Sequence, residues 1–301
     1  MVQPEQQVPA RVARALLFVA GVLALWSTVV AGQVLLRSTR AVFLDVGDAD
    51  CAVVHGANGR VLVIGDGGER GERVLLPYLL SAGVRRVDAL IVASPLVGGA
   101  QPLLRLLAEV PVDRLLVSPE VARSAAAVEV MLAARGRGAQ VLELADGLTF
   151  SLGRGTAATV VTYLAAQRAV RCVNIAKNGN VIVVGCGVGD PGPRRAPRPS
   201  GGAGVLKLPD CGRGAEVQGA LVRALRPRVV VISADGARGR DSPSPALLRQ
   251  LFAAHIPLFR TDADGAVTVA LRGAAISVNA HAGRRVVLSS RCRGGAAHEA
   301  R

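Results

Sequence analysis

The stretch IVASPLVGGAQPLL, residues 91–104, begins as a strand and continues as a helix after a turn that contains two glycines. Its first residues, 91–94, are the end of a nearly continuous apolar run, VDALIVAS (87–94), which is typical of a strand buried on both faces. In open α/β sheets, ligands bind beyond the carboxyl ends of such strands. This turn contains no His, Cys, Asp, Glu or Lys, so the usual place for catalytic groups carries no ionisable side chain.

The chain from Arg40 onward alternates short apolar strands with helices, which predicts a layered α/β body whose helices cover packed sheets. Strands are expected at 41–46, 51–56, 60–68, 87–94, 113–118, 148–153, 157–164, 173–179, 180–187, 204–209, 229–234, 276–280 and 285–290. Helices are expected at 72–83, 101–109, 118–136, 216–227 and 244–256, the third starting at Ser118 or Pro119. Residues 258–271 are predicted to form a hairpin with its turn at 262–265.

An uncharged segment, ALLFVAGVLALWSTVVAGQVLL (15–36), follows a short polar N-terminus (1–14) and two arginines. Its length suits a transmembrane helix. Alternatively it is a cleaved signal segment, with Val29 and Ala31 at the −3 and −1 positions of the cut. The first interpretation predicts a single-pass protein of the cell membrane, and the second a secreted one. In both, the soluble domain is extracytoplasmic.

The formal charge of +14 and the pI of about 11.2 come almost entirely from arginine, since the only lysines are Lys177 and Lys207. Such a surface attracts DNA or anionic lipid, although a generally basic surface would give the same numbers. The five cysteines include no C-x-x-C pair, and the four histidines lack metal-ligand spacing. The expected divisions are a domain at 40–285, a mobile loop at 190–204 and a basic tail at 286–301.

Four stretches, in order along the chain, resemble the metallo-β-lactamase-fold domain at the C-terminal end of ComEC, the DNA-uptake channel protein. They are FLDVGDADCAVVHGANGRVLVIGDGG (43–68), VLLPYLLSAGVRRVDALIVASP (74–95), GVLKLPDCG (204–212) and ALRPRVVVISADGARGRDSPSPALLRQLFAAHIPLFRTDADGAVTV (224–269). The resemblance covers about residues 41 to 270. It implies an αββα sandwich preceded by an apolar helix similar to ComEC's last membrane span.

The resemblance also implies a two-metal site, but its ligands have been replaced in this sequence. The first two His of the family motif S-H-P-H-x-D-H fall on Ser94 and Leu96, and its Asp and last His fall on Gly98 and Gly99. The bridging Asp of T-G-D falls near Gly187. H-H-G has become Asp210-Cys211-Gly212, and the late G-H-P has become Asp241-Ser242-Pro243. Ser, Leu and Gly cannot supply the converging N and O ligands that zinc or manganese needs. The resemblance therefore implies a pseudo-enzyme with no metal cofactor and no catalytic residue.

The remaining carboxylates leave a second interpretation open. Asp45, Asp50, Asp66 and Asp210 could together hold a divalent metal such as Zn or Mn in a divergent hydrolase or nuclease. Against this, Asp48 and Asp50 are explained by a tight turn in which Asp is favoured locally. Cys211 would need a nearby base to act as a nucleophile, and no histidine is expected close to it.

Three roles follow from these interpretations. The first is a binding or structural role linked to DNA uptake, with the membrane contacted through 15–36 and DNA or anionic lipid through the arginine-rich surface. The second is a metal-dependent hydrolase. The third is a purely structural part of a split channel, which would bind neither metal nor DNA.

Overall fold

The computed structural model describes Val19 and residues 38–96, 98–190, 202–236, 242–289 and 298–300. The segment expected to cross the membrane, 15–36, therefore lies outside the described residues except for Val19, as does most of the loop expected at 190–204. In the part of the chain that is described, no helix is long and apolar enough to cross a membrane. The chain divides into two units at Arg37, and the body considered below begins at Ser38.

The described strands form one sheet of ten and one of seven. The first sheet has the order β17-β16-β15-β14-β1-β2-β3-β4-β5-β6. Its strands are β1 (Arg40–Phe43), β2 (Ala52–His55), β3 (Val61–Ile64), β4 (Ala89–Val92), β5 (Arg114–Val117), β6 (Gln140–Glu143), β14 (Val267–Arg272), β15 (Ala275–Ala280), β16 (Arg285–Ser289) and β17 (His298–Ala300). The second sheet has the order β13-β12-β11-β10-β9-β8-β7. Its strands are β7 (Thr149–Gly153), β8 (Thr156–Ala165), β9 (Arg168–Lys177), β10 (Asn180–Gly189), β11 (Val205–Lys207), β12 (Val229–Ile232) and β13 (Leu258–Arg260).

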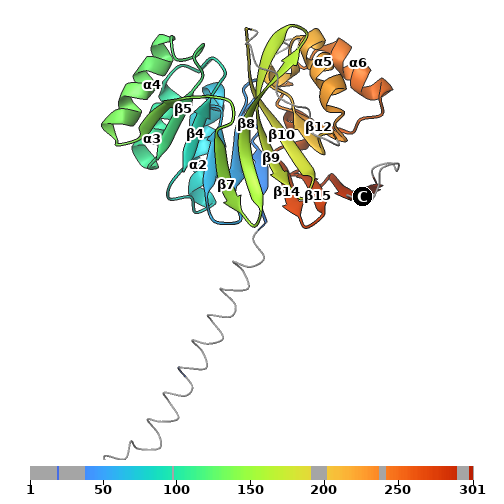
Figure 1. The fold of residues 1–301 in the computed structure, drawn as a ribbon, viewed down its shortest axis with the longest axis horizontal. Coiled ribbons are helices and arrows are strands. Elements are labelled where there is room, and N and C mark those ends of the chain that lie inside the picture. Colours follow the sequence, from blue (N-terminus) through green and yellow to red (C-terminus); the bar gives the residue numbers. More distant parts are fainter. Residues whose placement is uncertain are drawn as a thin grey trace, which may run out of the picture. The chain divides into compact units, whose positions relative to one another are not determined.

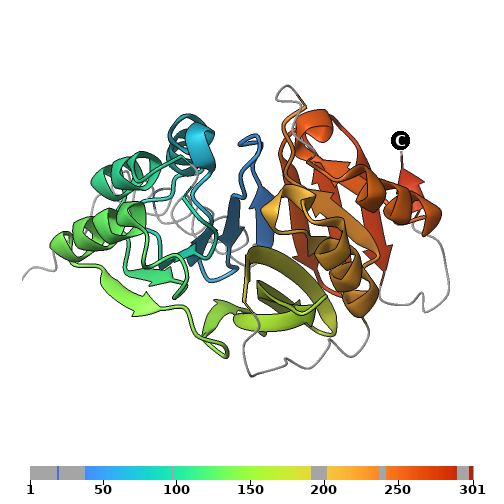
Figure 2. The same cartoon turned by 90° about the horizontal axis from the view of Figure 1, so that it is seen from above.

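Helices cover the outer face of each sheet (Figures 1 and 2). The α-helices are α2 (Gly71–Ser81), α3 (Gln101–Glu109), α4 (Ala125–Gly136), α5 (Ala215–Leu225), α6 (Pro245–Ala253) and the short α7 (Thr261–Asp264). Single 3₁₀ turns are η1 (Gly68–Arg70) and η2 (Asp210–Gly212). α2, α3 and α4 share an apolar core with the first sheet, and α5 and α6 share another with the second sheet.

A third apolar core lies between the two sheets and joins Phe43 and Ile91 of the first sheet to Val173 and Phe259 of the second. Three cores separate four layers, so the body is an αββα sandwich. The expected layered α/β fold is confirmed at this level. The likeness to ComEC in particular remains a prediction.

The hairpin predicted at 258–271 is wrong, because its two halves belong to different sheets. β13 pairs in parallel with β12, whereas β14 pairs antiparallel with β1. Between them, the expected turn residues form α7, and Asp264 accepts the backbone N–H of Arg260 at 2.8 Å. Local alternation of apolar residues indicates a strand but does not identify its partner.

Two element boundaries also differ from the prediction. α4 begins at Ala125, not at Ser118 or Pro119, because the Ser124 hydroxyl caps it by accepting the backbone N–H of Ala127 at 3.2 Å. The domain does not end at residue 285. β16 continues to Ser289 with Val286 and Leu288 buried in the intersheet core, so the first residues of the expected tail belong to the sheet.

Strand direction gives the sandwich two distinct edges. The carboxyl ends of β3, β4 and β5 and of β10, β11 and β12 lie at one edge, which we call the site edge. β1 starts at the opposite edge, which we call the entry edge. The two sheets are aligned, because the backbone N–H of Asn58 at the entry edge donates to the carbonyl of Leu152 at 3.2 Å.

Candidate functional site

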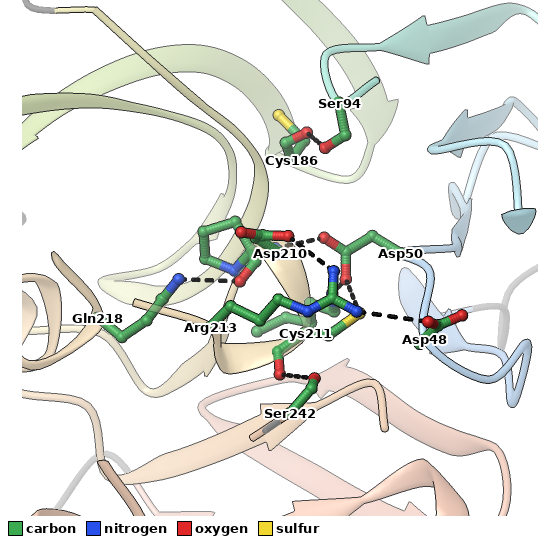
Figure 3. A network of polar contacts seen from close by, with 11 residues as sticks. Asp48, Asp50, Ser94, Cys186, Asp210, Cys211, Arg213, Gln218 and Ser242 are labelled. Atoms are coloured by element: carbon green, nitrogen blue, oxygen red, sulfur yellow. Dashed lines mark hydrogen bonds and ion pairs between the residues drawn. The ribbon is translucent and has the colours of Figure 1, made fainter. Parts of the chain in front are cut away.

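Asp50, in the turn between β1 and β2, is the centre of a polar network that joins the two sheets at the site edge (Figure 3). Its Oδ1 pairs with Nζ of Lys207, the last residue of β11. Its Oδ2 accepts the backbone N–H of Asp210 at 2.7 Å. The side chains of Asp50 and Lys207 are only 9% and 1% exposed, so this is a buried ion pair.

The contacts of Asp50 correct the sequence interpretation, which explained Asp48 and Asp50 by local turn chemistry. Both carboxylates instead reach residues of the other half of the chain, Asp50 through Lys207 and Asp48 through Arg213. Sequence reasoning missed Lys207. The available signal was the position of a lysine at the end of an apolar strand in a chain with only two lysines.

Arg213 lies at the rim of the network, between two carboxylates. Its two terminal nitrogens are 3.4 Å from Asp48 Oδ2 and 3.4 Å from Asp210 Oδ1. Burial raises the pKa of Asp210 above its ordinary value, and the Arg213 charge opposes that rise. The charges at the rim are thus largely satisfied within the protein.

Cys211 is buried directly beneath Asp50 and is poorly suited to nucleophilic chemistry. Its Sγ is 3.8 Å from Asp50 Oδ1, and burial raises the pKa of the thiol well above its ordinary value. A protonated thiol is a weak nucleophile unless a base activates it. His55, expected at a strand boundary, is at the entry edge, where its Nε2 lies 2.9 Å from the Tyr78 hydroxyl.

Ser242 and Cys186 have structural roles in the network. The Ser242 hydroxyl donates to the carbonyl oxygen of Cys211 at 2.8 Å. Cys186 is buried, as its apolar strand predicted, and burial raises its pKa to about 12. The four described cysteines, 51, 172, 186 and 211, are free thiols.

Ser94 and Leu96 both contribute to packing. The Ser94 hydroxyl, just after β4, donates to the carbonyl oxygen of Cys186 in β10 at 2.6 Å, which ties the sheets together (Figure 3). Leu96 is half-buried and packs against the apolar core beneath α2, α3 and α4.

At two of the glycine positions, neighbouring backbone leaves no room for a side chain. A Cβ on Gly98 would lie 2.5 Å from the carbonyl carbon of Gly68, and one on Gly187 would lie 2.2 Å from the carbonyl oxygen of Ala93. These are the positions onto which the resemblance places two aspartate ligands, and any side chain there would overlap a neighbouring backbone segment. Gly99 differs, since no described atom lies within 4 Å, but its φ of +73° favours glycine.

The four candidate carboxylates do not form one group. Asp66 is buried with 5% exposure, and burial raises its pKa to about 6. Its Oδ2 has no hydrogen-bond partner among the described residues. Asp66 and Asp210 each have Asp50 as an electrostatic neighbour, whereas the electrostatic neighbours of Asp45 are Arg70, Asp235 and Asp262.

This donor set does not fit a two-metal centre. Within the described ranges, no three His, Cys, Asp or Glu side chains are grouped so as to hold a metal ion. One oxygen of Asp50 is already paired with an ammonium group and the other with a backbone N–H. The fold and site therefore define an αββα sandwich whose site edge is occupied by internal polar contacts.

Comparison with known proteins does not narrow the description of this chain beyond an αββα sandwich. The sequence matches no protein-family model and no curated protein. Among solved structures, a new diphosphatase from the PhnP family is similar at 11% identity over 78% of this chain and 99% of that chain, with a TM-score of 0.44. Zn²⁺-bound PqqB from Methylobacterium extorquens is similar at 13% identity over 70% of this chain and 83% of that chain, with a TM-score of 0.42. At these values neither likeness indicates what this chain binds or does.

Proposed function

We propose that this chain is a membrane-attached, ComEC-like domain of the metallo-β-lactamase fold that has lost its catalytic metal site. Its role is then binding or structural, in a process such as DNA uptake. The observation that carries the proposal is the buried Asp50–Lys207 pair, which places a fixed ammonium group at the centre of the network. The sequence resemblance supports the family assignment, and the arginine-rich composition supports an anionic partner.

A metal-dependent hydrolase needs ligands that converge on the ion and an open position where the ion activates water. At the site edge, the Lys207 ammonium group already neutralises Asp50. Backbone contacts exclude side chains from Gly98 and Gly187. Restoring a metal centre would therefore require both a new charge arrangement and a moved backbone.

A divergent metal-dependent hydrolase is the alternative, and one observation favours it. Asp66 is buried with an oxygen that lacks a partner among the described residues, as a vacant ligand would be. Asp50 acts electrostatically on Asp66, and Asp210 in turn has Asp50 as a neighbour. Binding of a cation by these three groups would have to displace Lys207 from Asp50.

Phosphodiester hydrolysis separates the two functions. The full chain, assayed on bis(p-nitrophenyl) phosphate with added Zn²⁺ or Mn²⁺, is expected to give no turnover above the metal-only rate, because nothing in the site activates water. An Asp66→Asn variant serves as the control for contaminating hydrolases. Metal-dependent turnover that disappears in this variant would establish the alternative.

A further inference from the structure

The entry edge of the sandwich is strongly basic. The strands and loops that begin or end there carry exposed arginines, none of which pairs with a carboxylate of the described residues: Arg40, Arg85, Arg135, Arg137, Arg226 and Arg272. Three acidic residues at this edge are already paired: Asp88 with Arg60, Asp113 with Arg86 and Glu109 with Arg105. A positive field therefore remains at the entry edge.

The carboxylates gather at the opposite edge instead. The turns of the site edge contain Asp45, Asp48, Asp50, Asp66, Asp210, Asp235, Asp262 and Asp264. Three arginines of that edge, Arg70, Arg213 and Arg260, are bound to these carboxylates. Among the described residues, carboxylates are thus concentrated at the site edge, whereas the entry edge carries several exposed arginines without a carboxylate partner.

Two large apolar side chains are exposed on helices that end at the entry edge. Leu80 is 54% exposed in the last turn of α2, and Phe252 is 83% exposed in the last turn of α6. Both helices end at the entry edge, because each leads into a strand that starts there. A surface that carries both exposed apolar and basic groups is suited to the interfacial region of a bilayer.

Few residues of sequence separate the entry edge from the proposed membrane segment. Residues 15–36 are uncharged, and only three residues separate Leu36 from Arg40 at the start of β1. Four Cα steps reach about 14 Å at most. If 15–36 is held in a bilayer, Arg40 cannot be farther than this from the end of that segment.

We propose that the entry edge is a docking surface for anionic lipid head groups, with Arg85 and Arg137 among its contacts. This inference rests on the membrane attachment proposed above but not on the loss of the metal site. A bilayer accounts for both parts of the surface, since phosphate groups attract the guanidinium groups and the interface accepts Leu80 and Phe252. Duplex DNA would use the arginines alone.

Hydrogen–deuterium exchange of the full chain tests the docking surface. The chain is placed in nanodiscs of phosphatidylcholine, or of phosphatidylcholine with about 30% phosphatidylglycerol. We expect exchange in 82–88 and 136–139 to slow about threefold or more in the anionic discs. The site-edge turns at 166–167 and 281–284 should not change.

Paired charge reversals provide the matched control. Arg85→Glu with Arg137→Glu is expected to abolish the slowing, whereas Arg73→Glu with Arg123→Glu, equally exposed but at the site edge, should preserve it. Equal exchange in both lipids, or failure of the chain to associate with either disc, would overturn the proposal. Slowing of the same turns by duplex DNA but not by anionic lipid would also overturn it and assign the surface to nucleic acid. None of these results bears on the proposed loss of the metal site, which the metal content of the protein tests separately.

Discussion

Replacement of Lys207 by methionine is expected to lower the free energy of unfolding by about 3–5 kcal/mol at neutral pH. The change leaves the Asp50 carboxylate buried, with 9% exposure, and without its cation. The cost is that of an uncompensated charge in a place that water barely reaches. Urea unfolding followed by circular dichroism measures it, with the urea midpoint shifted and the slope unchanged.

Two further variants of this pair make the result specific. Lys177→Met removes the only other lysine, which is half-buried at the end of β9, and is expected to cost less than about 1 kcal/mol. Asp50→Asn combined with Lys207→Met should recover much of the lost stability, since no buried charge remains. If Lys207→Met and Lys177→Met cost the same, the buried pair does not have the structural role assigned to it.

Gly187→Asp, which places a carboxylate where the sequence resemblance to ComEC would put the bridging ligand, is expected to cost about 3 kcal/mol or more, or to prevent folding. The new Cβ would lie 2.2 Å from the carbonyl oxygen of Ala93, so β4 and β10 would have to separate. The soluble yield and the thermal midpoint of the variant measure the effect.

Gly136→Asp is the matched control for that substitution. It adds the same side chain at an exposed position where no described atom lies within 4 Å, and it should cost less than about 1 kcal/mol. A Gly187→Asp protein as stable as this control would show that the site edge has room for a ligand, contrary to the closure inferred here.

Local pattern predicted most of the elements of the sandwich but not all of their partners. The helix expected at 101–109 is α3 with the same bounds, because its leucines recur at helical spacing and its end is followed by a strand. The hairpin expected at 258–271 was wrong, since alternating apolar residues do not distinguish pairing within one sheet from a crossing between two.

The candidate site was predicted less completely than the fold. The resemblance to ComEC pointed to positions such as Ser94 and Gly187, where the residue types present are not metal ligands in that family. It could not reveal that Asp50 pairs with a lysine 157 residues away, or that neighbouring backbone closes over the glycines. Both facts depend on how strands from the two sheets meet, which no local spacing encodes.

The metal content of the full chain tests the central claim most directly. The protein is purified without chelator and analysed by elemental mass spectrometry. We expect less than about 0.1 equivalent of zinc or manganese per chain, because no convergent ligand set is present among the described residues. One or two equivalents per chain, retained through gel filtration and lost in Asp66→Asn, would contradict it and place a metal among the remaining aspartates.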